Sequence, residues 1–219
     1  MKELLNNPGA ICYEDAFLLI LNKPAGLLVH PTVHEDGTSL YNYVQRYYKA
    51  QALDLKVHPV SRLDRFTSGL VVFAKSPQVQ YNLSKTGFTK TYLALLSSRP
   101  PHRNGLIDAP IARKEGSIIE RCVSPLGKPA QTRYQVIRTC GQLTLVRLQL
   151  LTGRTHQLRV HCAYLGCPVY QDHLYGLPGP QTRHMLHAYR LAFSHPVSGR
   201  HLEITCAPPQ DMRSLIFKV

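Results

Sequence analysis

The sequence is short of acidic residues, of long apolar runs and of closely spaced cysteines, and each shortage argues against a class of protein. Thirteen Asp and Glu stand against 26 Lys and Arg, so the formal charge is +13 and the isoelectric point is near 9.7. The longest unbroken apolar run, Ala16 to Leu21, is too short to span a membrane. The six cysteines form no C-x-x-C pair, which argues against a structural zinc site and a disulfide framework.

The rest of the composition is that of a basic globular protein. Hydrophobic residues make up 44% and charged residues 18% of the chain, a balance typical of folded domains. We expect a single catalytic domain over residues 1–219, with a cleft between two lobes as a variant of this plan. Because the positive charge is spread along the chain and does not line one helix, it favours a nucleic acid over a membrane surface as partner. We expect a cytoplasmic protein.

Short apolar segments bounded by turn residues predict an α+β fold, with a large antiparallel or mixed sheet and flanking helices. Strands are predicted over residues 10–13, 17–21, 69–74, 90–96, 130–138 and 143–150. Helices are predicted over residues 39–49, 77–85 and 156–165, with Thr38 or Ser39 capping the first and Thr155 the last. On the last helix His156 and Arg159 share a face because they are three residues apart.

Three segments place chemically capable residues in loops or near the ends of elements. The segment HPVSRLDRFTSG, residues 58–69, has one carboxylate, Asp64, between Arg62 and Arg65. Flanking guanidinium groups favour the ionised carboxylate, which suits a nucleophile or a cation-stabilising group. The segment KTYLAL, residues 90–95, carries Tyr92, and GRTHQLRVH, residues 153–161, carries Arg159. Taken singly, the three residues are better explained as a solvated ion pair on a turn, a half-buried strand tyrosine and a helix-surface arginine.

Taken together, these segments resemble the signature motifs of the RluA-type pseudouridine synthases, and the resemblance covers the chain from about residue 11 to 212. Four further segments follow in the family's order: LNKPAGLLVH at 21–30, GKPAQTRYQV at 127–136, MLHAYRLAFSHP at 185–196 and APP at 207–209. The chain departs from the family at Ser61, where His is common, and at Phe66, where an acidic residue is frequent.

The resemblance implies the pseudouridine synthase fold, with a central catalytic cleft and no organic cofactor or metal. By this similarity Asp64 is the catalytic aspartate, Tyr92 packs on the target base and Arg159 forms an ion pair with the aspartate. Arg62 would fill the gap that the extruded uridine leaves in the RNA stack. RNA contacts are further assigned to basic residues of the same motifs: Arg65, Lys23, Arg154 and His156.

The implied reaction moves uracil from an N1 to a C5 linkage on the same ribose. Asp64 would stabilise or capture positive charge at the anomeric carbon, or attack C6 of the base, and removal of a sugar proton is a third route. The substrate would be rRNA or tRNA and the enzyme a monomer. The S4-like RNA-binding domain of many members would have no room before Ile11. The alternative is a noncatalytic RNA-binding or ribosome-assembly protein with the same fold. His184 and His187 lie near metal-ligand spacing, but no carboxylate or cysteine completes a ligand set.

Overall fold

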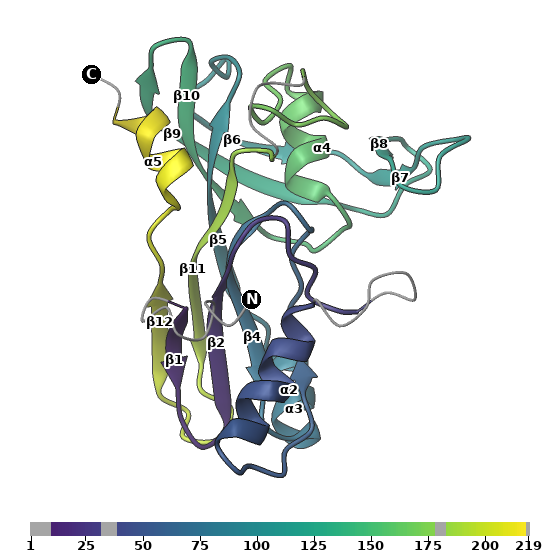
Figure 1. Ribbon diagram of the computed structural model, residues 1–219. Coiled ribbons are helices and arrows are strands. Elements are labelled where there is room, and N and C mark those ends of the chain that lie inside the picture. The colour runs from purple at the N-terminus through teal and green to yellow at the C-terminus, as the bar shows by residue number, and fades with distance from the viewer. Residues whose placement is uncertain (1–9, 32–38, 178–182, 218–219) are drawn as a thin grey trace. The chain divides into compact units, whose positions relative to one another are not determined.

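The computed structural model describes residues 10–31, 39–177 and 183–217, which form two compact units. Unit 1 consists of Met1–Phe88 and Ala188–Ala207, and unit 2 of Thr89–His187 and Pro208–Val219. Figure 1 labels the helices and strands along the chain. In unit 1 these are β1 (Ile11–Glu14), β2 (Leu18–Lys23), α2 (Leu40–Ala50), β3 (His58–Pro59), β4 (Ser68–Ala74), α3 (Pro77–Thr86), most of β11 (Leu186–Ser194) and β12 (His201–Thr205).

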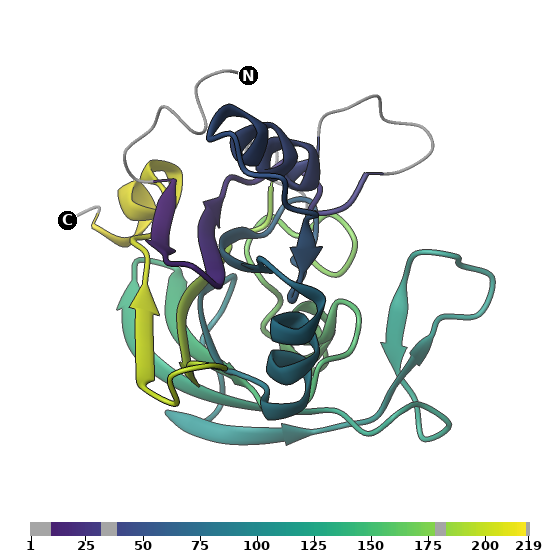
Figure 2. The ribbon, with the colours of Figure 1, turned by 90° about the horizontal axis from the view of Figure 1, so that it is seen from below.

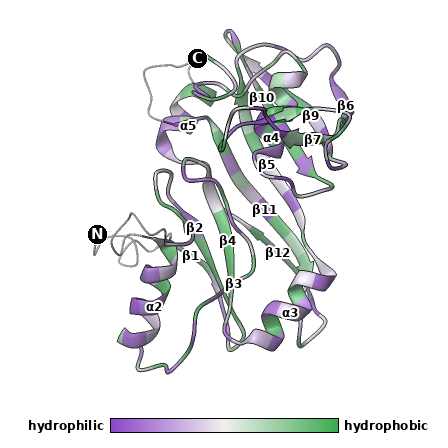
Figure 3. Ribbon diagram, turned by 90° about the vertical axis from the view of Figure 1, so that its right-hand side faces the viewer, coloured by the Kyte–Doolittle hydropathy of each residue, from purple (hydrophilic) through white to green (hydrophobic). Residues whose placement is uncertain are grey.

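The core of unit 1 lies on both sides of β2 and β4, which pair antiparallel along their whole length. Successive side chains of a strand point to opposite faces, so each strand contributes to two clusters. One cluster combines Leu18, Ile20, Leu70 and Val72 with Val79 and Leu83 of α3. The other combines Leu19, Leu21, Val71 and Phe73 with Leu40, Tyr43, Val44 and Tyr48 of α2. Burial on both faces explains why both strands are almost continuously apolar (Figure 3).

Unit 2 is built on a four-stranded antiparallel arrangement in the order β5-β10-β9-β6. These strands are β5 (Thr89–Leu96), β6 (Asn104–Asp108), β9 (Gln131–Cys140) and β10 (Leu143–Leu150). A separate hairpin pairs β7 (Ile111–Arg113) with β8 (Arg121–Val123) and stands out from the rest of the unit in Figures 1 and 2. Helix α4 (Gln157–Tyr164) packs near this hairpin through Val160, and α5 (Gln210–Ile216) lies near the C-terminus.

The structure confirms the α+β class and every strand and helix predicted from the sequence, with shifts of a few residues at their ends. Ser39 caps α2 through its side chain, and Thr38 lies outside the described residues. The predicted cap at Thr155 is wrong: His156 occupies the cap position of α4 with a left-handed φ of 57° and no capping side-chain bond. A single domain over 1–219 and a central cleft stay predictions.

Candidate active site

Asp64 lies in the loop between β3 and β4, immediately before a strand whose seven residues are all buried. The chain turns sharply after it, because the Asp64 carbonyl accepts a hydrogen bond from the Thr67 amide at 3.1 Å. Thr67 and Ser68 are buried, whereas Asp64 itself is only partly buried. The turn therefore ends in a fixed strand and keeps Asp64 beside the surface, where a substrate can reach it.

Gly69 fixes the position of β4 next to β11. Its φ of +114° is rarely adopted by residues with a side chain, and a Cβ there would lie 2.3 Å from the carbonyl oxygen of Ala188. The Ala188 backbone lies within a strand and cannot move away from this Cβ as a flexible side chain could. Only glycine therefore fits at this point of the loop-to-strand transition.

The segment Lys23–Gly26 fastens the loop from the other side. The Lys23 ammonium donates to the carbonyls of Pro24, Leu27 and Arg65 at 2.8–2.9 Å, and its residue has no exposed surface. The Gly26 amide donates to the same Arg65 carbonyl at 2.9 Å, and Arg65 Nε returns a bond to the Gly26 carbonyl at 3.1 Å. These bonds hold the backbone one residue after Asp64.

This burial counts against the RNA-contacting role that the sequence suggested for Lys23, which stays a prediction. A phosphate must meet a side chain at the surface, and Lys23 presents none. A buried ammonium is tolerated when its protons are bonded, and three carbonyls supply those bonds here. We therefore assign Lys23 to holding the loop in place.

The other basic residues of the loop lie at the surface, as an RNA-contacting role requires. Arg62 and Arg65 are exposed, and the Arg65 guanidinium lies 5.6 Å from the centre of the Phe66 ring, which is 40% exposed. Ser61 faces inward: its hydroxyl accepts the Val72 amide of β4 at 3.1 Å. Of the two departures from the family pattern, Ser61 therefore joins the loop to the strand and Phe66 places an aromatic ring at the surface.

Tyr92 lies in the middle of β5, opposite Leu148 of β10, and is only 6% exposed. Its position on a central strand fixes the direction of its ring more firmly than a loop would. The burial suits both a core tyrosine and a tyrosine that packs against a bound base.

Arg159 lies in α4 with 5% of its surface exposed and is held by a carboxylate of its own unit. Its Nε and Nη2 atoms donate to the two oxygens of Asp172, both at 2.7 Å, and the Asp172 side chain is fully buried. Burial raises the pKa of this carboxyl, but the hydrogen bonds and charge of Arg159 outweigh it and leave the pKa below its usual value. The pair is therefore ionised at neutral pH. The predicted pairing of Arg159 with Asp64 joins the two units and stays a prediction.

The loop before α4 is organised by Gln157, whose buried side chain replaces a conventional cap. Its carbonyl oxygen accepts from the Arg154 amide and the Thr152 hydroxyl, both at 2.9 Å, and its amide donates to the Gln131 carbonyl at 2.9 Å. Arg154 Nε also donates to the Pro129 carbonyl. The predicted RNA contacts Arg154 and His156 are thus set on a loop that is bonded to β9, and both are partly buried.

The predicted shared face of His156 and Arg159 is confirmed by their common neighbour, Tyr175. The His156 Nδ1 atom lies 2.8 Å from the Tyr175 hydroxyl oxygen, and the Arg159 guanidinium lies 5.0 Å from the centre of the Tyr175 ring. One aromatic side chain therefore joins both residues of the third motif.

A comparison with known proteins places this geometry in a family. The family described as RNA pseudouridylate synthase matches residues 17–164. The chain belongs to this family. The uncharacterized RNA pseudouridine synthase YjbO of Bacillus subtilis (strain 168) is 38% identical to it over 214 residues, 95% of this chain and 76% of that protein. The ribosomal large subunit pseudouridine synthase D of Vibrio parahaemolyticus is 36% identical over 224 residues, 94% of this chain and 69% of that protein.

Solved structures support the same fold for this pseudouridine synthase. Human RNA Pseudouridylate Synthase Domain Containing 4 aligns with a TM-score of 0.79 at 24% identity, over 98% of this chain and 93% of that chain. Human RNA Pseudouridylate Synthase Domain Containing 1 aligns with a TM-score of 0.75 at 27% identity, over 94% and 85%. The protein is thus an isomerase with the pseudouridine synthase fold.

The sequence analysis missed Asp172 and Tyr175, although the sequence contains a signal for the first. Asp172 is the only acidic residue between Glu120 and Glu203, a stretch that holds many Arg and His residues. A single carboxylate in a stretch rich in cationic residues is a candidate ion-pair partner for a buried arginine. Tyr175 carries no comparable signal, because nothing local distinguishes it from the other tyrosines of the pseudouridine synthase.

The structure also bears on metal ions, membranes and disulfides within the described part of the chain. No three His, Cys, Asp or Glu of these residues gather as a metal site would require. No described helix is long and apolar enough to cross a membrane. No disulfide joins the cysteines whose side chains are described, which are Cys12, Cys122, Cys162, Cys167 and Cys206.

Proposed function

We propose that this pseudouridine synthase isomerises uridine at specific positions of rRNA or tRNA, with Asp64 as the catalytic carboxylate. Family membership supports the reaction, and a relative named as a ribosomal large subunit enzyme supports rRNA as the substrate class. The charge of +13 suits an RNA backbone. We further propose that the enzyme acts as a cytoplasmic monomer without a cofactor.

The observation that carries the role of Asp64 is the fastening of its loop. Lys23, Gly26 and Arg65 bond the backbone just after the carboxylate, while the Asp64 carbonyl closes a turn with Thr67. A catalytic group must be held within a fraction of an ångström of its productive position, which a loose surface carboxylate is not. A structural ion pair on a surface turn would need no such support.

The chemistry requires a carboxylate because breaking the N1 glycosidic bond builds positive charge at the anomeric carbon. Three routes are open: Asp64 stabilises or captures that charge, Asp64 adds to C6 of the base, or a sugar proton is removed. The routes differ in their intermediate, but each of them requires the carboxylate. The uracil then turns and bonds through C5, which gives up its proton while N1 gains one. No electrons are gained or lost, so no redox partner is required.

The remaining site residues take roles that suit their surroundings. Tyr92 offers a buried ring that packs on the extruded base. Arg159, with its charge secured by Asp172, supplies a fixed cation to the reacting centre. The exposed Arg62 replaces the extruded base in the stack, and Arg65, Arg154 and His156 contact RNA.

The alternative, a noncatalytic RNA-binding or ribosome-assembly protein, is the weaker proposal. A protein that only binds RNA gains nothing from a negative charge in a basic loop, because Asp64 would repel phosphate. The buried Arg159–Asp172 pair and the fastened loop are likewise more than nonspecific RNA binding needs.

The test replaces Asp64 with Asn, which keeps the shape of the side chain and removes its charge. Release of tritium from 5-labelled uridine in rRNA and tRNA measures turnover, and we expect the variant to show none above background while it folds and binds RNA like the parent. Asp54→Asn, the same change at an exposed position, is the control and should keep parental turnover. Substantial turnover by Asp64→Asn would refute the assignment. A map of pseudouridine in rRNA and tRNA from cells with and without the protein identifies the substrate.

A further inference from the structure

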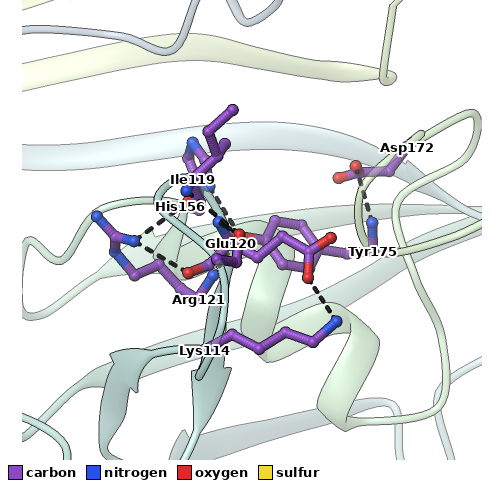
Figure 4. Close-up of polar contacts among 8 residues, drawn as sticks. Lys114, Ile119, Glu120, Arg121, His156, Asp172 and Tyr175 are labelled. Carbon is purple, nitrogen blue, oxygen red and sulfur yellow. Dashed lines mark hydrogen bonds and ion pairs between the residues drawn. The ribbon is translucent and has the colours of Figure 1, made fainter.

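Tyr175 uses its ring and its hydroxyl for different neighbours, and Figure 4 shows those of the hydroxyl, Arg121 and His156. It follows Asp172 by three residues in a short turn, in which the Asp172 carboxylate accepts the amides of Leu174 and Tyr175 at 3.0 and 3.2 Å. The backbone of Tyr175 is therefore tied to the carboxylate that binds Arg159. Nothing in the reaction requires Tyr175 itself to touch RNA.

The ring of Tyr175 limits where the Arg159 guanidinium can lie. The guanidinium carbon is 5.0 Å from the ring centre, within the range of a cation–π contact, while two of its nitrogen atoms are bonded to Asp172. The carboxylate fixes the direction of the fork, and the ring supports the same group from its face. A cation with these two supports has little freedom to turn away from its position.

The hydroxyl of Tyr175 reaches a different part of unit 2, the β7–β8 hairpin. It accepts the amide of Arg121, the first residue of β8, at 2.9 Å. It also lies 2.8 Å from Nδ1 of His156, a hydrogen bond whose direction depends on the tautomer of the imidazole. This bond supports His156 in the left-handed conformation that opens α4, three residues before Arg159.

The base of the hairpin packs through Ile111 and Val123 against Val160 of α4, and the Tyr175 hydroxyl adds a polar anchor to this apolar contact. Beyond β7 and β8 its tip is exposed, with Ile118 81% and Ile119 55% accessible. Its internal bonds, including the Lys114–Glu120 ion pair and the Arg121 guanidinium bonds to the carbonyls of Ile119 and Glu120, hold its own shape (Figure 4). These internal bonds do not place the hairpin relative to α4, which the packing of Val160 and the Tyr175 hydroxyl do together.

We propose that Tyr175 is a positioning residue that fixes Arg159 and the β7–β8 hairpin relative to each other, the ring acting on the arginine and the hydroxyl on the hairpin. This inference rests on the proposed function only where it concerns turnover. The two actions are separable, because Phe keeps the ring and loses the hydroxyl, whereas Leu loses both.

The experiment compares Tyr175→Phe and Tyr175→Leu with the parent, and uses Tyr164→Phe, at an exposed tyrosine of α4, as the control. Amide hydrogen exchange at Arg121 reports on the hairpin. We expect it to become about tenfold faster in both Tyr175 variants, since one hydrogen bond is lost. The control should exchange at the parental rate.

Turnover of RNA reports on the ring. We expect Tyr175→Phe, which keeps the ring, to retain kcat within about twofold. Tyr175→Leu should lower kcat about tenfold with little change in KM. The reason is that Leu removes the cation–π contact to Arg159, a group that acts in the transition state. Rescue of kcat by Phe separates positioning from a general loss of packing.

Each result decides a distinct claim. Parental exchange at Arg121 in Tyr175→Phe would overturn the role of the hydroxyl, and parental kcat in folded Tyr175→Leu would overturn that of the ring. Should Tyr175→Leu fail to fold, the NMR signal of the Arg159 Nε–H in Tyr175→Phe decides whether the ring holds Arg159. An unshifted, protected signal supports this role of the ring. A signal broadened by exchange refutes it. Failure of the proposed function shows separately, as an inactive parent or an active Asp64→Asn, and leaves the exchange result standing.

Discussion

Replacing Asp172 with Asn removes a buried negative charge and hardly changes the shape of the side chain. In the parent both carboxylate oxygens lie 2.7 Å from nitrogen atoms of Arg159, and the Asp172 side chain has no exposed surface. Removing one member of a buried ion pair costs about 3–5 kcal/mol, because the other charge stays buried without that counter-charge. We expect the free energy of unfolding to fall by this amount at pH 7.

The chain offers a matched control for this change. Asp211 also binds an arginine through both oxygens, Arg183, at 2.6 and 2.9 Å, but its side chain is 31% exposed. The two arginines are equally buried, but water reaches the Asp211 carboxylate and weakens its pair, so Asp211→Asn should cost less than Asp172→Asn. The two pairs differ in the burial of the carboxylate and share the residue types, so the difference in unfolding free energy measures the effect of carboxylate burial.

The pH dependence gives the same prediction a second test. The folded pKa of Asp172 is held below its usual value by Arg159 despite burial. Its contribution to stability is therefore complete above the unfolded aspartate pKa of about 3.9 and is lost as the pH falls through the folded value. Asp172→Asn has no carboxyl to protonate and should lose this part of the acid limb.

Urea unfolding followed by circular dichroism, at pH 7 and in steps down to pH 3, measures both effects. Equal destabilisation by Asp172→Asn and Asp211→Asn would show that burial of the first pair is not decisive. An acid limb of Asp172→Asn that runs parallel to that of the parent would show that Asp172 does not titrate as the ion pair requires.

Two further predictions concern the backbone and the charge. Gly69→Ala should unfold the protein or cost several kcal/mol, because its Cβ would meet the Ala188 carbonyl. Gly199→Ala, at a positive φ with open space, should cost about 1–2 kcal/mol in the same urea unfolding assay. RNA affinity should fall steeply between about 50 and 200 mM salt, because neutralised phosphates release counterions, and a flat filter-binding series would contradict this account.

Local patterns predicted the elements of the fold because the forces that form them are local. The apolar run over residues 69–74 predicted a strand, and the structure buries Leu70 to Phe73 between α2 and α3. Ser39 was one of two candidate caps for the first long helix, and it is the one that bonds the α2 amide. The three-residue spacing of His156 and Arg159 put both on one face.

Site residues that depend on distant partners were harder to predict. Lys23 was assigned to RNA from its charge and motif, but burial against three carbonyls, one of them at Arg65, gives it a structural task. Thr155 was predicted as the cap because threonine is a common capping residue. In the structure the Gln157 side chain, from within the helix, accepts the hydrogen bonds of the Arg154 amide and the Thr152 hydroxyl. Side-chain type indicates what a residue can bond, and the surrounding chain decides what it meets.

The sequence by itself determined the class of fold through its periodicity and the family through the order of its motifs, while the roles that the resemblance implies for Asp64, Tyr92 and Arg159 stay predictions. Only the tertiary structure decided that Asp172 neutralises Arg159 and that Tyr175 connects it to the hairpin. The reason is physical: these contacts join residues 13 or more positions apart. Their energies depend on burial and distance, which the chain acquires only on folding.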